Sequence, residues 1–459
     1  MQEGYILSFT SFIQECSKNE NTKITHAIYM SEDSVLNEYV RYPYKKDSLK
    51  LFFSMTKSFT SLAVGIALDL GLLHLDDYIA GFFPDELPPI PDKNLDKITV
   101  RHLLTMSCGI HENTYPELFA QGDWVKAFLG QSFPHEPGTY YRYSTHSSHM
   151  LSAIITKVSG LSLEQFLNIY LFYPMEIYEA QWELSPEKLT AGGMGLSLYP
   201  RSLVKIARML LQDGVYKGRQ FIAKEYLKMA ATRQIIKQEE RDRADCEYCG
   251  SGYGFQFHIG KDGYYRMDGA FGQLCLLCPD KKRAVIVFSQ YARMEDLLSL
   301  VYKHLLNDTE GCGDISDNGR TPKKTISPKA AIPSGKFRLQ ENNQGIEAVE
   351  FIAAGDEYLL ALHYPTCTDT IRFSLLHETR GTMNFRKDLQ VHPQEYYCEA
   401  AFNNALTLNI FLIETPYVAV YHFTFGANTV QVTFSVNVSF TLQDFSVNGY
   451  LTVKKQEEK

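Results

Sequence analysis

The segment of residues 308–334 constrains the fold most, because it separates two parts of the chain that have different patterns. It is rich in Gly, Ser, Asn and Pro, a composition typical of linkers. With 459 residues, the chain is long enough for two or more domains. We therefore expect one domain over residues 1–307, a linker over 308–334 and a second domain over 335–459.

The first part has strand patterns near both ends and helical patterns between them. Residues 24–53 alternate like strands, while 54–70 and most of 99–212 have helical spacing. Further expected elements are strands at 253–259, 264–267, 274–278 and 284–289 and a helix at 294–306. This order predicts an α+β fold, in which an antiparallel sheet is flanked by helices as an α/β sandwich. The helical insertion covers about residues 60–240.

The second part contains only strand patterns. Strands are expected at 337–339, 348–352, 358–363, 371–375, 406–413, 418–425, 430–440 and 450–453. Turn residues such as Gly355-Asp356 separate them. The pattern predicts a C-terminal all-β domain, a small barrel or a curved sheet. This domain carries no motif, so two roles stay open: a lid or packing module, or the source of a loop that narrows the substrate cleft.

The net charge, the apolar runs and the cysteine spacing argue against a nucleic-acid partner, a membrane span and a disulfide framework. The net charge is −8, so the chain has no basic footprint for nucleic acid. The N-terminus lacks the basic and apolar regions of a signal peptide, and the apolar run 62–68 ends at Asp69, far short of a membrane span. Nine irregularly spaced cysteines argue against a disulfide framework. We expect no membrane span and a cytoplasmic location.

A candidate nucleophile lies at Ser54-Met55-Thr56-Lys57, one of three S-x-x-K sequences; the others begin at Ser185 and Ser202. Ser54 opens an apolar helix, and a spacing of three residues places Lys57 on the same helical face. A desolvated Lys57 would have a lowered pKa and could take the proton of the Ser54 hydroxyl. The alternative is an ordinary helix N-cap followed by a solvated lysine.

Further segments occur in a fixed order after Ser54. They are residues 100–109 (VRHLLTMSCG), the Pro137-Gly138 turn before Tyr143-Ser144-Thr145, the loop 191–195 (AGGMG), and Met267-Asp268-Gly269. With these segments, residues 25–305 resemble the penicillin-recognising serine hydrolases. The likeness is greatest to the branch that contains class C β-lactamases, D-peptidases and esterases.

The resemblance implies a role for several residues. Ser54 would be the acylated nucleophile and Lys57 its general base. Tyr143 would exchange a proton with the serine and the leaving group, its phenol kept acidic by Lys57. The backbone N–H groups of Ser54 and Ala270 would form the oxyanion hole. The substrate would be a small molecule or peptide, with no cofactor required.

The sequence departs from the family at two substrate-binding positions. Thr145 stands where the family has Asn, which shortens the side chain expected to bond to the substrate. Met267-Asp268, before Gly269, replaces a basic or His position that binds the carboxylate of penicillins. Asp268 would repel such a carboxylate. We therefore expect weak activity on β-lactams and cleavage of a neutral or cationic ester, amide or peptide.

Possible metal and nucleotide sites receive little support. Cys246 and Cys249 form one C-x-x-C pair, but Cys275 and Cys278 lie in a strand and point to opposite faces. The pair His146 and His149 has no evident carboxylate to complete a site, and no phosphate-binding motif occurs. We expect no metal and no cofactor.

Two functions from different classes remain. The first is a serine hydrolase that forms an acyl-enzyme on Ser54. The second is a catalytically silent penicillin-binding-like protein that binds a peptide or cell-wall fragment; the altered residues 267–268 keep this alternative open. The sequence does not distinguish hydrolysis of the acyl-enzyme by water from transfer of its acyl group to an amine, and it does not specify the oligomeric state.

Overall fold

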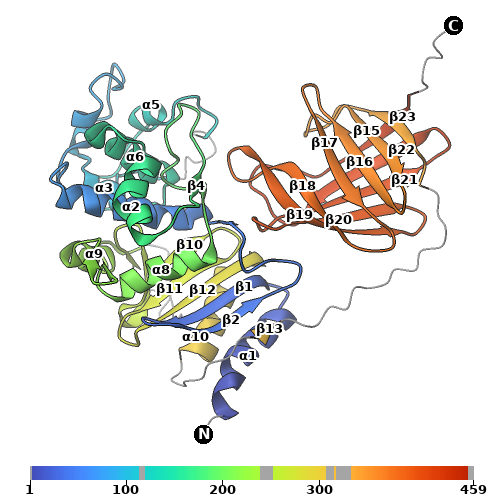
Figure 1. Cartoon of the computed structure of the whole chain (residues 1–459). Helices are drawn as coiled ribbons and strands as arrows, with labels where there is room; N and C mark the ends of the chain where they lie inside the picture. Colours follow the sequence, from blue (N-terminus) through green and yellow to red (C-terminus); the bar gives the residue numbers. More distant parts are fainter. Residues whose placement is uncertain (1–2, 113–118, 238–251, 307–314, 317–331, 453–459) are drawn as a thin grey trace. The chain divides into compact units, whose positions relative to one another are not determined.

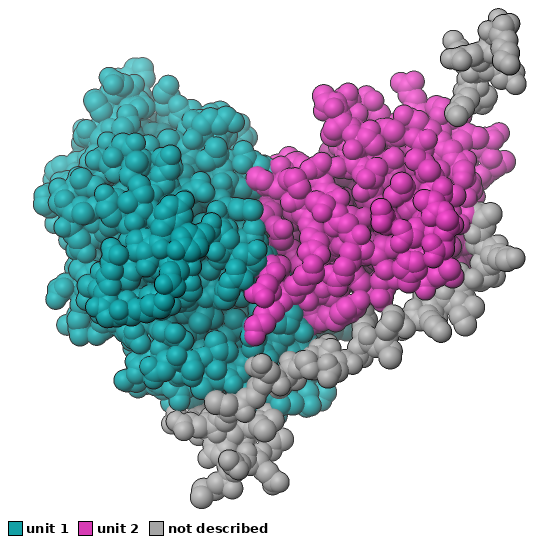
Figure 2. Space-filling view, in the orientation of Figure 1, with its two compact units in different colours: residues 1–40, 49–315, 388–390 teal, residues 41–48, 316–387, 391–459 magenta. Residues whose placement is uncertain are grey.

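The computed structural model describes residues 3–112, 119–237, 252–306, 315–316 and 332–452, which form two compact units (Figure 1). Unit 1 comprises residues 1–40, 49–315 and 388–390 (Figure 2). Unit 2 comprises residues 41–48, 316–387 and 391–459.

The main sheet of unit 1 brings the two ends of its sequence together. Its strand order is β13-β2-β1-β12-β11-β10-β9-β8. The strands are β1 (Thr22–Ser31), β2 (Val35–Val40), β8 (Gly252–Tyr253), β9 (His258–Ile259), β10 (Tyr265–Gly269), β11 (Gln273–Cys278), β12 (Arg283–Ala292) and β13 (Ile315–Ser316). Because β1 pairs antiparallel with β12, the helices between them in sequence form an insertion. The predicted antiparallel sheet with a helical insertion is confirmed.

Helices cover both faces of this sheet. On one face, α1 (Glu3–Lys18) and α10 (Met294–Leu305) bury Phe12 and Val301 against β11 and β12 (Figure 1). On the other face, α2 (Thr56–Asp69) and α8 (Pro200–Leu211) belong to the larger core. Alternate side chains of a strand point to opposite faces, so Cys278 joins the first core and Cys275 the second, as expected. The sequence analysis did not predict α1.

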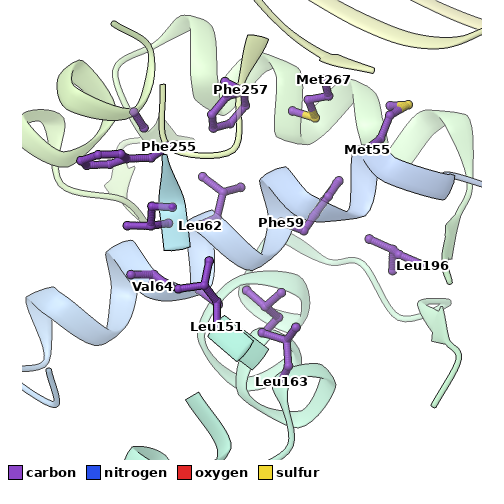
Figure 3. Packing of buried hydrophobic residues seen from close by; sticks show 14 of the residues in the cluster. Met55, Phe59, Leu62, Val64, Leu151, Leu163, Leu196, Phe255, Phe257 and Met267 are labelled. Atoms are coloured by element: carbon purple, nitrogen blue, oxygen red, sulfur yellow. The ribbon is translucent and has the colours of Figure 1, made fainter. Parts of the chain in front are cut away.

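The helix α2 forms the centre of the helical insertion. Its residues from Thr56 to Ala67 are all buried, and Phe59, Leu62 and Val64 lie among side chains such as Leu151 and Leu163 (Figure 3). The helical insertion also contains α3 (Val100–Leu104), α5 (Trp124–Leu129), α6 (Thr145–Ser159), α7 (Leu163–Leu167), α9 (Lys224–Ala230), η2 (Ile79–Phe82), η3 (Leu95–Lys97), η4 (Asn168–Phe172), η5 (Tyr173–Met175), and the short strands β4 (Gln181–Trp182), β5 (Leu196–Leu198), β6 (Val215–Tyr216) and β7 (Arg219–Gln220). Before α2 come β3 (Lys50–Leu51) and η1 (Phe53–Met55), and η7 (Lys261–Gly263) lies between β9 and β10. Among the described helices, none is both long and apolar enough to cross a membrane.

Unit 2 is a single antiparallel sheet that curls almost into a barrel. Its order is β17-β16-β15-β14-β23-β22-β21-β20-β19-β18. The strands are β14 (Gly335–Leu339), β15 (Ala348–Ala354), β16 (Glu357–His363), β17 (Thr368–Phe373), β18 (Thr379–Arg386), β19 (Val391–Phe402), β20 (Leu406–Leu412), β21 (Val418–Phe425), β22 (Thr429–Val436) and β23 (Phe445–Leu451).

Side chains connect the two end strands of this sheet. The hydroxyl of Thr379 on β18 donates to the carbonyl of Arg372 on β17 at 2.6 Å, and the amide of Asn384 on β18 donates to Asp369 on β17 at 2.7 Å. The predicted all-β domain is confirmed. The sequence analysis missed β18 and β19, where Pro393 and charged residues obscure the strand pattern.

Candidate active site

Ser54 lies in a tight turn at the start of α2. It belongs to the 3-10 turn η1, between β3 and α2, and is half-buried. The preceding residue, Phe53, has a φ of 47°, a left-handed conformation that is uncommon for a residue other than glycine. Buried Met55 and Phe59 anchor the turn and the helix in the core (Figure 3). A rigid element therefore presents the Ser54 hydroxyl.

Lys57 lies one helical turn later and contacts this hydroxyl. Its Nζ donates to Ser54 Oγ at 3.0 Å and to the carbonyl oxygen of Gly193 at 2.7 Å. The Lys57 side chain is buried, with 1% of the residue exposed. Burial disfavours the charged amine and lowers the pKa of Lys57 to about 7. The amine is thus partly neutral at neutral pH and is suited to accept a proton.

The loop 191–195 is fixed where its carbonyl can hold Lys57. The indole N–H of Trp182 donates to the carbonyls of Ala191 and Met194, at 2.8 and 3.1 Å. The Thr60 hydroxyl donates to the carbonyl of Gly192 at 2.6 Å. Lys57 itself donates to the carbonyl of Gly193. Four successive backbone carbonyls of the loop, from residue 191 to residue 194, thus accept hydrogen bonds from buried side chains. The sequence motif of small residues lies beside the candidate base.

Thr145, the first residue of α6, packs against the same loop. A Cβ at Gly193 would lie only 2.6 Å from Thr145 Cγ2 and 3.4 Å from Lys57 Nζ. Only glycine fits at this close approach. Thr145 therefore lies beside Lys57, as its place in the sequence motif predicts.

Tyr143 completes the cluster around Ser54. Its hydroxyl hydrogen-bonds with that of Ser54, and the Lys57 Nζ lies 4.9 Å from the centre of its ring. Burial raises the pKa of Tyr143. The expectation of an acidic phenol was wrong, because desolvation of the phenolate outweighs the hydrogen bond with Ser54, and the charge of Asp268 raises the pKa of Tyr143 further. Tyr143 is a neutral hydroxyl, suited to donate a hydrogen bond or a proton.

Asp268, on β10, does not carry an isolated negative charge. Arg266 Nε lies 3.0 Å from both carboxylate oxygens of Asp268. In addition, His258 on β9 places its Nδ1 3.8 Å from Asp268, and Lys237 Nζ lies 3.0 Å from the same His258 nitrogen. Arg266 therefore offsets part of the charge of Asp268, while the expectation that Asp268 disfavours a carboxylate stays a prediction.

His258 is a neighbour of Tyr143, and Lys237 contacts His258; neither residue was predicted from the sequence. The rings of His258 and Tyr143 have centroids 6.1 Å apart. Burial lowers the pKa of His258 well below its usual range, so the ring is neutral and can accept a hydrogen bond from Lys237. The spacing of Arg266 and Asp268 could have revealed their pairing, because residues two apart share a strand face. Lys237 had no such local signal.

Gly269 and Ala270 lie against the turn that holds Ser54. A Cβ at Gly269 would lie 2.5 Å from the carbonyl oxygen of Phe52, so this strand approaches the backbone closely. The next residue, Phe271, packs its ring against that of Phe53, with centroids 5.3 Å apart. The end of β10 and η1 are therefore neighbours, an arrangement that the predicted oxyanion hole of Ser54 and Ala270 requires.

Comparison with known proteins identifies the family of this chain. Residues 24–303 match the model of a family described as Beta-lactamase. The chain belongs to the beta-lactamase family. This family member is 27% identical over 136 residues to a beta-lactamase of Escherichia coli K12. The aligned region covers 29% of this chain and 35% of the relative. The matched regions span about a third of the length of the curated relatives.

Two solved structures of the beta-lactamase fold resemble this chain over different shares of its length. A penicillin-binding protein homologue from Pyrococcus abyssi has a TM-score of 0.54 at 17% identity and covers 96% of this chain and 99% of its own. EstCE1, described as a hydrolase with promiscuous acyltransferase activity, has a TM-score of 0.52 at 16% identity. The match covers 64% of this chain and 98% of EstCE1. At these identities the likeness shows the fold.

The other two S-x-x-K sequences of this beta-lactamase family member do not build such a site. The Ser185 hydroxyl bonds to the backbone of Leu189. The Ser202 hydroxyl bonds to Glu179, while Lys205 Nζ donates to the backbone carbonyls of Met175 and Glu176. Only the sequence at Ser54 pairs a buried amine with its serine.

The candidate metal ligands that the structure describes do not come together in one group. Among the residues that the structure describes, no group of three or more His, Cys, Asp or Glu side chains could hold an ion. Cys246 and Cys249 lie outside the described residues. His149 does have a carboxylate nearby, contrary to expectation: its Nε2 lies 2.7 Å from Glu187. His146 is buried, which lowers its pKa to about 3, so its ring is neutral.

The segment Asp388–Gln390, which groups with unit 1, adds a further carboxyl group. The N–H groups of Leu389 and Gln390 donate to Glu183, at 2.9 and 3.1 Å. Burial, followed by the charge of Glu183, raises the pKa of Asp388 to about 7. Asp388 interacts electrostatically with Lys57. No local pattern could have predicted this neighbour, because it is far from Lys57 in the sequence.

Proposed function

We propose that this protein is a serine hydrolase that forms an acyl-enzyme on Ser54 and cleaves an ester, amide or peptide bond. The observation that carries the proposal is the buried Lys57 amine, 3.0 Å from Ser54 Oγ and with a pKa lowered to about 7. A serine hydroxyl alone is a weak nucleophile, and a neutral amine at this distance can activate it. The family membership and the hydrolase fold support the same conclusion.

The reaction follows from these positions. Neutral Lys57 accepts the proton of Ser54 Oγ as the oxygen attacks the carbonyl carbon of the substrate. The N–H groups of Ser54 and Ala270 stabilise the negative charge that develops on the carbonyl oxygen. Tyr143 donates a proton to the leaving group and regains one from the Lys57 ammonium. Water then attacks the acyl-enzyme by the reverse path and releases the acid.

The substrate class extends beyond β-lactams. A structural neighbour, EstCE1, is described as a hydrolase with promiscuous acyltransferase activity, which favours acyl esters as test substrates. Weak activity on β-lactams would follow from the short side chain of Thr145 and from Asp268, whose charge Arg266 offsets in part. Transfer of the acyl group to an amine, in place of water, would use the same intermediate.

The alternative is a silent binding protein, and covalent labelling separates the two. A fluorophosphonate should add one label per chain by intact mass, located on Ser54 by peptide mapping. The variant Ser54→Ala should remain unlabelled, while Ser185→Ala and Ser202→Ala should be labelled like the wild type. Absence of label on the folded wild type, together with binding of peptides, would favour the silent protein.

A further inference from the structure

Two phenylalanines with unusual backbone conformations flank the candidate oxyanion hole. Phe53 immediately precedes Ser54 and has a φ of 47°. Phe271 immediately follows Ala270 and has a φ of 63°. A bulky side chain in this region is sterically disfavoured, and such strain persists only where the surroundings hold it. Both strained residues thus lie next to the two proposed oxyanion donors.

The rings of these two residues hold each other. Their centroids are 5.3 Å apart and their planes meet at 87°, the edge-to-face geometry that aromatic pairs prefer. The Phe53 side chain is buried. We call this contact the aromatic pair. It adds a side-chain contact between η1 and the turn after β10 to the close backbone approach of these two segments.

The backbone on the β10 side has further anchors. The carbonyl of Phe271 accepts from the N–H of Ala292 at 2.9 Å. A Cβ at Gly272 would lie 2.4 Å from Cβ of Ala292, so this turn lies directly on β12. The turn is thus fixed to the sheet. Because the ring of Phe271 packs against that of Phe53, the position of this turn also restricts the position of Phe53.

We infer that Phe53 and Phe271 are positioning residues, whose contact sets the spacing of the Ser54 and Ala270 N–H groups. The inference rests on the proposed function, because it presumes an acyl transfer at Ser54. The peptide that carries the Ser54 N–H is bonded directly to the Cα of Phe53, so rotation there turns the donor. Oxyanion stabilisation requires donors at about 2.7–3.1 Å from the developing charge, so small rotations reduce the rate.

The test replaces Phe271 and measures chemistry and stability separately. In Phe271→Ala, the second-order rate of fluorophosphonate labelling should fall about 10-fold to 100-fold, less than loss of a whole oxyanion donor. With p-nitrophenyl acetate, kcat should fall by a similar factor while KM changes little, because the donors act in the transition state. Phe271→Tyr keeps the ring and should retain most of the rate.

A matched control separates positioning from general packing. Phe257 and Tyr265 form another edge-to-face pair in unit 1, with centroids 5.4 Å apart and planes at 86°. Phe257→Leu should lower the urea midpoint and leave the labelling rate of the folded protein near that of the wild type. If Phe271→Ala does not fold, Phe53→Gly tests the same contact, since glycine accepts a positive φ.

The outcomes distinguish this inference from the proposed function. If the wild type labels on Ser54 but both Phe271→Ala and Phe53→Gly keep its labelling rate, the aromatic pair has no positioning role. An equal loss of rate in Phe257→Leu would also overturn the inference. If the folded wild type does not label at all, the proposed function fails and the inference fails with it.

Discussion

Arg266 Nε lies 3.0 Å from both carboxylate oxygens of Asp268, and the two side chains are mostly buried. This pair occupies the strand that borders the candidate nucleophile. Arg266 therefore offsets part of the charge of Asp268. The electrostatics near Tyr143 depend on Asp268 and on side chains outside the family motif, such as Arg266 and His258.

The pairing of Arg266 with Asp268 predicts a stability effect. Removing one partner of a buried ion pair leaves an uncompensated charge, so Arg266→Met should lower the free energy of unfolding by about 3–5 kcal/mol. The double variant Arg266→Met/Asp268→Leu should recover part of this loss. Urea unfolding at pH 7 measures both. A single variant as stable as the wild type would show that Asp268 is well solvated.

The low pKa of Lys57 predicts a pH profile for acylation. Burial lowers the pKa of Lys57 to about 7, and only the neutral amine can accept a proton. The rate of fluorophosphonate labelling should therefore rise with pH, reach half its maximum near pH 7 and level off about one unit higher. Lys57→Arg should remove the rising limb and most of the rate, because a guanidinium stays protonated. A wild-type limb centred near pH 10 would mean that the amine is solvated.

The neutral phenol of Tyr143 predicts a dependence on the leaving group. Tyr143→Phe removes the proton donor, so cleavage of alkyl esters, whose leaving group needs a proton, should slow about 10²–10⁴-fold. p-Nitrophenyl acetate should lose less, because p-nitrophenolate leaves without protonation. The ratio of kcat/KM for the two esters is the measurement. An equal loss on both would assign Tyr143 to activation of Ser54 instead.

The short side chain of Thr145 predicts a specificity change. Thr145→Asn restores an amide that can bond to the substrate, so nitrocefin turnover should rise about tenfold or more relative to p-nitrophenyl acetate. Thr145→Ser, which lacks the amide, serves as the control and should not show this rise. Fast nitrocefin turnover by the wild type would show that Thr145 does not limit β-lactam recognition.

The sequence by itself determined the elements whose residues repeat with a regular period. The helix after Ser54, strands β1 and β10–β12 and most strands of unit 2 follow from apolar spacing, because burial of one face requires it. The spacing of Ser54 and Lys57 is also local, since three residues make nearly one helical turn. Motif order then predicted the family, which the comparison confirmed.

Only the tertiary structure decided the charges and protonation around Ser54. The pKa of Lys57 and that of Tyr143 depend on burial by segments distant in sequence, and the acceptor for Lys57 is the carbonyl of Gly193. The ring contact of Phe53 with Phe271 likewise joins two separate segments. A local pattern specifies which face of an element is apolar; it contains no information on which distant group will lie against that face. Desolvation and long-range pairing arise only when the chain has folded.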